Sequence, residues 1–188
     1  MTDRELLGAY VASNDRESLG AFVTRYQASL LRFVGRLLGD PDAAQDVVQD
    51  TFLEVARHPR RLLEVESCHN WLLRVARNLG VNRIRQDARV RKHTQALKER
   101  LGNGATGVAA DTASRALETE ELATSVRNEI GRLRPRHREL LLLKVQEEKS
   151  YREIAEITGL TVTNVGYILH CAMKELTARL NHVRGGLE

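Results

Sequence analysis

Apolar residues recur at helical spacing along most of this chain, and no segment alternates apolar and polar residues as a half-buried strand would. A short apolar stripe occupies residues 6–11, a longer one residues 19–37, and two more residues 40–55 and 70–92. Only 3 of the 188 residues are proline and 4% are aromatic, so few residues would interrupt helices. The pattern predicts an all-α fold.

A stretch of small and polar residues separates two such helical blocks. Residues 93–118 include three glycines within LGNGATG, a composition typical of a flexible linker. We therefore expect two small helical domains, residues 1–92 and 119–188, joined by a flexible linker at 93–118. Residues 58–69 break the helical pattern inside the first domain.

Charge and cysteine content limit the partners and the compartment. The net charge of +4 and the pI near 9.3 favour a polyanionic partner. No segment approaches eighteen consecutive apolar residues, and the N-terminus lacks the apolar core of a signal peptide. Two cysteines, Cys68 and Cys171, are too few for a disulfide framework. We expect a cytoplasmic protein with reduced thiols and no membrane partner.

Residues 151–170, YREIAEITGLTVTNVGYILH, have the pattern of a helix-turn-helix. Ala155 lies where two helices would cross closely, Gly159 would make the turn, and Val165 would anchor a second helix that enters the major groove. An ordinary helical hairpin in a bundle is the alternative. The polar residues that can contact bases or phosphates here are Arg152, Thr161, Thr163, Asn164, Tyr167, His170 and Lys174.

Residues 71–92 form a strongly basic segment, with seven arginines and lysines against one acid, Asp87. Such a run can neutralise phosphates and release their counterions, and a solvated basic face is the alternative. Asn78 and Asn82, one turn apart, can hydrogen-bond an exposed base, whereas Trp71 is either a platform for an unpaired base or a core anchor. The candidate DNA-binding residues of this segment are Arg74, Arg77, Asn78, Asn82, Arg83 and Arg85.

Residues 40–55, DPDAAQDVVQDTFLEV, place Asp42, Asp46, Asp50 and Glu54 on one face of a predicted helix. Like charges four residues apart destabilise an isolated helix by about 0.2–0.5 kcal/mol per pair. Only Asp42 benefits from the positive end of the helix dipole, so the other acids need another reason. The stripe is either a solvated face, partly paired with arginines of the same domain, or a surface that holds a basic protein.

These three segments, in this order, resemble the bacterial RNA polymerase sigma factors of the extracytoplasmic-function family. DAAQDVVQDTFLEV resembles the helix by which the family binds the polymerase clamp, and WLLRVARNLGVNRIR resembles its −10-reading helix. Residues 133–176 are similar to its C-terminal helix-turn-helix domain. The resemblance covers about residues 15–92 and 120–180.

The resemblance implies a sigma factor that lends promoter specificity to core RNA polymerase and is not an enzyme by itself. The first domain would bind the β′ clamp and would read and melt the −10 element. The second would bind the −35 element and the β flap, and an anti-sigma protein is a further implied partner. By resemblance, the polymerase-binding residues are Asp42, Asp46, Gln49 and Asp50.

The sequence departs from the family pattern at a few positions. Gln45 stands where the family usually has Glu, and Asn82 where it usually has Asp. The recognition helix has Gly166, Ile168 and Cys171 where basic residues are common, which implies fewer phosphate contacts at the −35 element. Gly166 would either permit close approach to DNA, pack against the preceding helix, or only lower stability.

Two other functions fit parts of the sequence. A self-sufficient helix-turn-helix regulator would bind duplex DNA without polymerase, through two-fold symmetric half-sites. A metal-dependent or thiol enzyme would use the dipeptides Cys68-His69 and His170-Cys171, but these lack zinc-ligand spacing and lie in different predicted domains. We expect no catalytic residue, metal or other cofactor.

Overall fold

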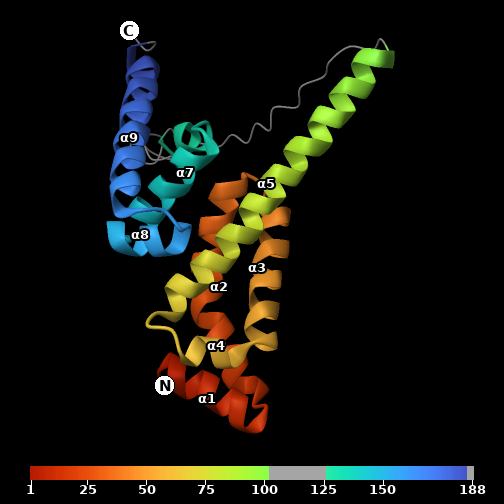
Figure 1. The fold of residues 1–188 in the computed structure, drawn as a ribbon, viewed down its shortest axis with the longest axis vertical. Helices are drawn as coiled ribbons and strands as arrows, with labels where there is room; N and C mark the ends of the chain where they lie inside the picture. Colours follow the sequence, from red (N-terminus) through yellow and green to blue (C-terminus); the bar gives the residue numbers. More distant parts are fainter. Residues whose placement is uncertain (102–125, 186–188) are drawn as a thin grey trace.

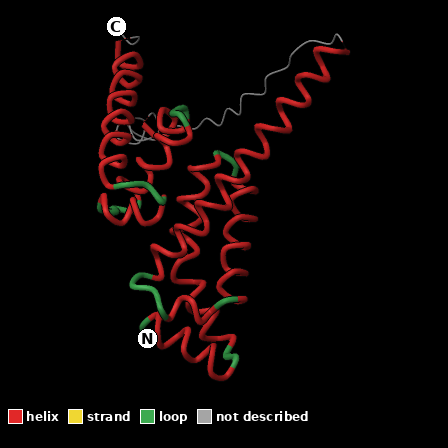
Figure 2. The backbone as a smooth tube through the Cα atoms, in the orientation of Figure 1, coloured by secondary structure: helices red, strands yellow, loops and turns green. Residues whose placement is uncertain are grey.

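The computed structural model describes residues 1–101 and 126–185, and within these ranges every regular element is a helix (Figures 1 and 2). The all-α prediction is therefore confirmed. The N-terminal half contains α1 (Asp3–Ser13), α2 (Arg16–Leu38), α3 (Pro41–Arg57), α4 (Pro59–Leu63) and α5 (Cys68–Leu101). The C-terminal half contains helical residues 126–131, then α7 (Pro135–Leu141), the π-helical turn η1 (Leu142–Gln146), α8 (Tyr151–Thr158) and α9 (Val162–Gly185).

Side-chain caps define where four of these helices begin. Thr2 and Ser150 each form a capping box with a glutamate three residues later, at the starts of α1 and α8. The Asp15 carboxylate accepts a backbone hydrogen bond at the start of α2, and the Asp40 carboxylate accepts two at the start of α3. These caps satisfy N–H groups that have no partner inside the helix.

The N-terminal half is a bundle of α2, α3 and α5, with α1 and α4 at one end (Figure 1). Its core includes the fully buried Phe22, Phe33 and Leu72. The sequence pattern did not predict α4, which has only five residues and is too short to show a helical period. The α5 helix continues to Leu101, into the range predicted as linker, and residues 102–118 of that range lie outside the described residues.

The C-terminal half places α7, η1 and α8 against α9. Gly159 ends α8 with a φ of 72°, a left-handed conformation that glycine adopts without strain, so the turn predicted there is present. Residues 140–143 are four consecutive leucines, and all four are buried. Consecutive residues point in different directions, so this segment needs apolar partners on more than one side. It contacts α9 on one side and α2 on the other.

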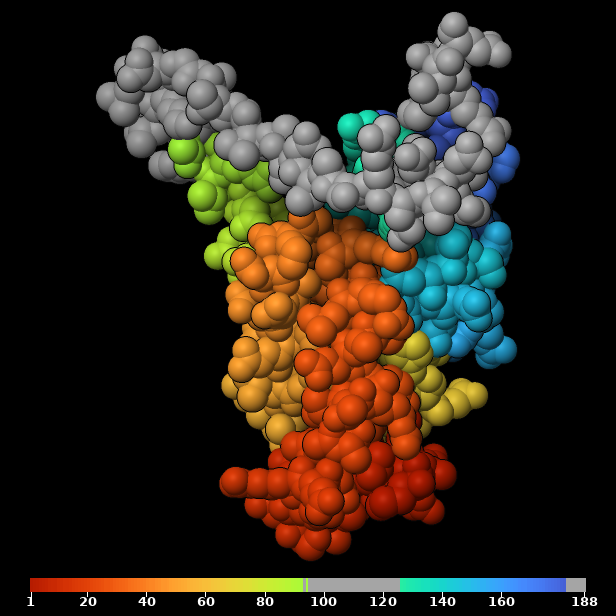
Figure 3. Space-filling view, turned by 180° about the vertical axis from the view of Figure 1, so that it is seen from behind, coloured from red at the N-terminus to blue at the C-terminus, as the bar shows by residue number. Residues whose placement is uncertain are grey.

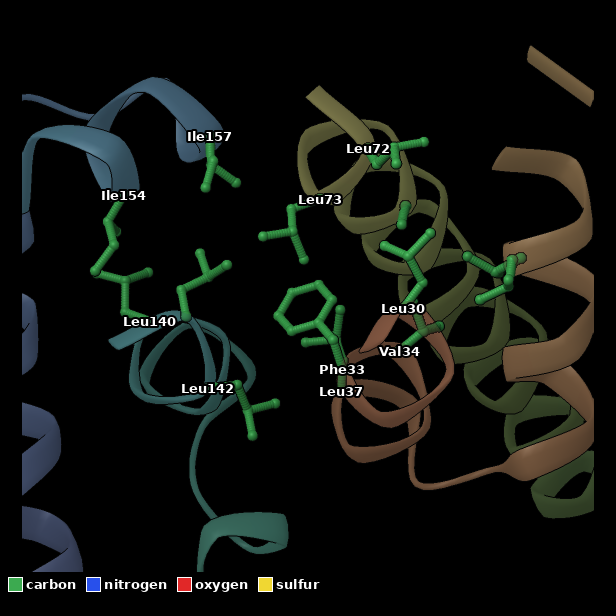
Figure 4. Packing of buried hydrophobic residues seen from close by; sticks show 14 of the residues in the cluster. Leu30, Phe33, Val34, Leu37, Leu72, Leu73, Leu140, Leu142, Ile154 and Ile157 are labelled. Carbon is green, nitrogen blue, oxygen red and sulfur yellow. The ribbon is translucent and has the colours of Figure 1, made fainter. Parts of the chain in front are cut away.

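The two halves are in direct contact, whereas the sequence pattern indicates only two bundles on a tether. Figure 4 shows Leu142 and Ile157 on one side of this contact and Phe33 and Leu73 on the other, and all four are buried in one continuous apolar cluster. The space-filling view shows the C-terminal half lying against the N-terminal half (Figure 3). In the described part of the chain, no helix combines the length and the apolar character needed to cross a bilayer.

Candidate functional site

The acidic stripe of α3 points away from the core. Asp42, Asp46 and Asp50 are exposed, while Ala44, Val47, Val48, Thr51 and Val55 on the opposite face are buried. Within residues 1–101 and 126–185, none of these three aspartates forms an ion pair, and only Glu54 does, with Arg57 at 2.9 Å (Oε1 to Nη1) and His58 at 3.9 Å. Pairing with basic groups of the same domain therefore accounts for Glu54 but not for the three aspartates.

An apolar groove of about 640 Å³ lies beside this stripe, between α2 and α3. Leu53 on its rim has 43% of its surface exposed. The predicted contact residue Gln49 lines the groove, and the other lining residues are Leu19, Val23, Gln27, Leu31, Gln45, Val48, Phe52, Leu53 and Ala56. Sequence periodicity indicated only an apolar stripe along residues 19–37, and it is the crossing of α2 and α3 that turns part of this stripe into an open groove.

The basic segment lies on α5, and its candidate residues divide into two groups. Arg74, Asn78, Asn82, Arg83 and Arg85 are exposed, and Arg83 comes within 3.7 Å of Asp87 on the same helix. Arg77 is different, since its side chain is only 12% exposed. Its Nε donates to Oε1 of Glu139 at 2.7 Å, and its Nη1 donates to Oδ1 of Asn78 at 2.8 Å. One predicted DNA-binding arginine is thus engaged by the C-terminal half.

A cavity of about 610 Å³ lies where the start of α5 faces α8. Trp71 lines the cavity and also packs against the core, so it combines a core contact with a partly exposed ring. Asn70 donates from Nδ2 to Glu153 at 3.2 Å, and its buried Oδ1 has no hydrogen-bond partner among the described residues. The remaining lining residues are Val65, Glu66, Ser67, Arg74, Ser150, Arg152, Glu153 and Glu156.

The helix-turn-helix of α8 and α9 presents a polar face to solvent. Val165, Leu169, Ala172 and Leu176 pack inward. The exposed candidate residues are Arg152 on α8 and, on or just before α9, Thr161, Thr163, Asn164, Tyr167, His170 and Lys174. The Thr161 hydroxyl accepts the backbone N–H of Asn164 at 3.2 Å, which caps the second helix at its start. The face predicted to meet DNA is therefore open to solvent, and Arg152 at its margin also lines the cavity beside Trp71.

The cysteines do not form a common centre in the described residues. Cys68 is buried, and its thiol donates to the carbonyl oxygen of Leu62 at 3.7 Å. Burial raises the pKa of the Cys68 thiol to about 11, so it is protonated at neutral pH. Cys171 is partly exposed. No group of three histidine, cysteine or acidic side chains in the described ranges is arranged to hold a metal ion.

Comparisons with known proteins match the N-terminal and C-terminal halves of the chain to two separate family models. Residues 22–90 match the Sigma-70 region 2 family model, and residues 123–176 match that of Sigma-70, region 4. The chain is 27% identical over 169 residues to RNA polymerase sigma factor YlaC of Bacillus subtilis, covering 90% of this chain and 95% of that protein. It is 30% identical over 160 residues to ECF RNA polymerase sigma factor SigC of Mycobacterium tuberculosis, covering 85% and 81%.

Two solved structures have a similar arrangement of helices. CnrH, in complex with the cytosolic domain of CnrY, has a TM-score of 0.65 and 25% identity, over 96% of this chain and 97% of that one. The sigma factor RpoE of Bartonella quintana, in complex with the anti-sigma factor NepR, has a TM-score of 0.59 and 21% identity, over 86% and 97%. The second likeness concerns the fold alone.

Proposed function

The chain belongs to the extracytoplasmic-function family of RNA polymerase sigma factors, and we propose which of its surfaces bind core polymerase and which bind promoter DNA. It binds core RNA polymerase and promoter DNA and directs promoter-specific initiation. It is a regulatory subunit and not an enzyme, as predicted. The alternative of a self-sufficient regulator is not favoured.

We propose that α3 is the polymerase contact, through Asp42, Asp46, Gln49 and Asp50. The observation that carries this assignment is a row of three exposed aspartates with no ion pair among the described residues, next to an apolar groove. A basic amphipathic partner helix would satisfy both features at once, because its apolar residues fill the groove while its cations face the stripe. The helical clamp of the β′ subunit is the partner that family membership suggests.

We propose that α5 reads the −10 element. Asn78 and Asn82 lie one turn apart on an exposed face with Arg74, and this arrangement suits an unpaired base held beside a neutralised phosphate. Unstacking a base costs a few kcal/mol, which contacts in a pocket must offset if the melted state is to persist. Trp71, which is partly exposed near the start of α5, is a candidate for a wall of that pocket.

We propose that α9 reads the −35 element from the major groove, with Thr163, Asn164, Tyr167 and His170 facing the bases. These residues recur at helical spacing on one exposed face. The exposed Lys174 and Arg152 would contact phosphates at its margins. The same C-terminal domain would contact the β flap of the polymerase.

The domain limits that we propose are 1–92 for polymerase and −10 binding, 93–118 for the linker, and 119–188 for −35 binding. Since α5 continues to Leu101, the first part of this linker would be a helical extension of the first domain. We place the protein in the cytoplasm, where polymerase and chromosome are found. An anti-sigma protein is a further partner that family membership suggests.

A run-off transcription assay with and without core polymerase tests this function directly. The purified chain should give no transcript alone and should direct core polymerase to a subset of promoter fragments. The isolated chain should bind the same fragments weakly and in a salt-sensitive manner, because each small basic domain makes few contacts until polymerase holds both. Tight sequence-specific binding by the isolated chain would instead support the self-sufficient regulator.

A further inference from the structure

An acidic edge of the C-terminal half lies against the part of α5 that we assign to the −10 element. This acidic edge consists of Glu139 on α7, Glu147 after η1, and Glu153 and Glu156 on α8. Three of these glutamates contact polar groups of the N-terminal half directly, and the fourth lines the cavity that also contains Arg74. The chain therefore places anionic oxygens where the proposed function requires nucleic acid.

The contact between Glu139 and Arg77 is the most buried of these. Their side chains are 3% and 12% exposed, and 2.7 Å separates Oε1 of Glu139 from Nε of Arg77. The second carboxylate oxygen of Glu139 lies 3.5 Å from Nη1 of Arg136. An arginine that holds a carboxylate in this way cannot contact a DNA phosphate at the same time.

Glu147 makes a second contact, with α2 and with the start of α5. Its side chain is 4% exposed, and Oε2 accepts from the Ser29 hydroxyl at 2.8 Å and lies 3.3 Å from Nε2 of His69. Burial alone would raise the pKa of Glu147, but its hydrogen bonds with His69, Gln146 and Ser29 outweigh burial and lower it. Glu147 is therefore ionised at neutral pH and contributes a real negative charge to the contact.

Glu153 approaches Asn70, beside the cavity lined by Trp71. Its pKa is lowered to about 2, chiefly by the backbone N–H and the hydroxyl of Ser150, so this carboxylate is also ionised. The Asn70 amide donates to it, as it could to a phosphate or a base. Like the Arg77–Glu139 contact, this one occupies a donor that could otherwise bind a DNA strand.

Other parts of the chain keep their proposed binding faces open in the same arrangement. Asn78 and Asn82 remain exposed on α5, as do Asn164 and Tyr167 on α9. The acidic stripe and the groove on α2 and α3 are open as well. Among the described side chains of the −10 helix, those that the C-terminal half covers lie in its first turns, around Asn70, Trp71 and Arg77.

We propose that the acidic edge occupies the start of the −10-reading surface in the free chain by standing in for DNA phosphates, so that −10 capture requires its release. This inference rests on the proposed function of α5. Because the stripe and the groove stay open, polymerase can dock on the closed chain first and then hold the halves apart. The −10 surface would thus become complete only after docking, which limits non-specific binding of single strands by the free chain.

Two adjacent glutamates give a matched test in the full-length chain. Glu147 is buried in the contact, whereas Glu148 is exposed and forms no ion pair or side-chain hydrogen bond among the described residues. Glu147→Lys and Glu148→Lys change the net charge equally, but only the first places a cation against His69, whose other ring nitrogen lies 3.4 Å from Nζ of Lys149. Small-angle X-ray scattering reports the radius of gyration, and the anisotropy of a fluorescein-labelled oligo-dT 12-mer reports single-strand affinity.

Glu147→Lys should have a larger radius of gyration than Glu148→Lys and should bind the single strand about tenfold more tightly. The tenfold gain is the value expected if about one free molecule in ten is open before the substitution and nearly all are open after it. Glu139→Gln removes the anion that pairs with Arg77 and should also raise both the radius of gyration and the single-strand affinity. It replaces Glu147→Lys in the test if that variant folds poorly. Equal affinities for the two lysine variants, or an unchanged radius in both Glu147→Lys and Glu139→Gln, would overturn the inference.

Run-off transcription separates this inference from the proposed function. With core polymerase present, Glu147→Lys should still support promoter-directed transcription, since the acidic edge is not needed once the halves are apart. A variant that transcribes normally but shows neither opening nor tighter single-strand binding contradicts the inference alone. Loss of −10 capture in Asn78 and Asn82 variants, described below, tests the assignment of α5 itself.

Discussion

Arg77 and Glu139 are 62 residues apart in sequence, yet their side chains meet at 2.7 Å (Nε to Oε1) and join α5 to α7 across the two halves of the molecule. Both side chains are largely withdrawn from water. Removing one member of a buried ion pair leaves an uncompensated charge, which typically costs about 3–5 kcal/mol.

We predict that Arg77→Ala lowers the free energy of unfolding by about 1 kcal/mol, less than for a fully buried pair because Arg136 can still approach Glu139 and because the halves can separate. Arg77→Met combined with Glu139→Gln should cost less than the sum of the single changes, because neither charge is then left alone. Urea unfolding measures the free energy of unfolding of the single and double variants.

Arg83→Ala is the control, since the Arg83 side chain is 45% exposed and its loss should lower the free energy of unfolding by no more than about 0.5 kcal/mol. Additive single changes would show that the pair is not coupled.

The acidic stripe gives the second prediction. Asp46→Arg combined with Asp50→Arg should leave the helical content unchanged, because both side chains are exposed, and should weaken binding to core polymerase by several kcal/mol. Pull-down of core polymerase measures the loss. The matched control is Glu64→Arg with Glu148→Arg, which makes the same change in net charge at two exposed glutamates outside the stripe. Equal retention of polymerase by both double variants would rule out the stripe as the contact.

The third prediction concerns base reading by α5. Alanine at both Asn78 and Asn82 removes two exposed amides from this helix without changing its charge. Open-complex formation with polymerase should fall while binding to −35 duplex fragments is kept, since the latter depends on α9. Permanganate footprinting of the melted segment measures opening. If a template with a pre-melted −10 segment shows no loss, other residues of the basic helix hold the base.

A fourth prediction follows from the lowered pKa of Glu153. A carboxyl with a pKa of about 2 in the folded chain and an ordinary value of 4.5 contributes stability that is fully present above pH 4.5 and is lost as the pH falls towards 2. Glu153→Gln should therefore flatten the decline in the free energy of unfolding over this window. Urea unfolding at several pH values measures the slope. An unchanged slope would mean that the capping box at the start of α8 does not carry this charge-dependent stability.

Much of the fold was predictable because most of its helices carry their own signals. The caps at Asp40 and Ser150, the apolar stripes and the glycine at 159 act within one helix or one turn, where sequence spacing describes them. The small and polar composition of residues 93–118 indicated a linker with at most a helical start, and α5 continues to Leu101. Periodicity did not predict α4, which is too short to carry an apolar stripe.

The contact between the halves could not be predicted in the same way. The pairs Arg77–Glu139 and Ser29–Glu147 join residues 62 and 118 positions apart, and nothing in either local pattern indicates its partner. The sequence therefore indicated that Arg77 is a free basic group like Arg74, whereas in the structure it is bound to Glu139. The groove beside Gln49 was missed because it depends on how α2 crosses α3. The exposed face of α9 was predictable because one helix alone determines it.

Gly166 supplies the last prediction. A Cβ atom at this position would lie 3.6 Å from Cε2 and 3.9 Å from Cδ2 of Tyr151 in α8, which is ordinary van der Waals contact. The missing side chain thus faces the preceding helix, which argues against close approach to DNA as the reason for a glycine here. The position also leaves room for a methyl group, so packing against α8 does not require glycine either.

Gly166→Ala should therefore raise the free energy of unfolding by up to about 1 kcal/mol, because alanine is favoured over glycine in a helix and the methyl group meets no clash. Binding to a −35 duplex in the presence of core polymerase should be unchanged. Thermal unfolding and a gel-shift titration measure the two effects. Gly8→Ala in α1, where a Cβ would meet no neighbour within 4 Å, is the control for the backbone contribution alone. A Gly166→Ala variant that is more stable but binds the −35 duplex less tightly would show that glycine is required for close approach to DNA.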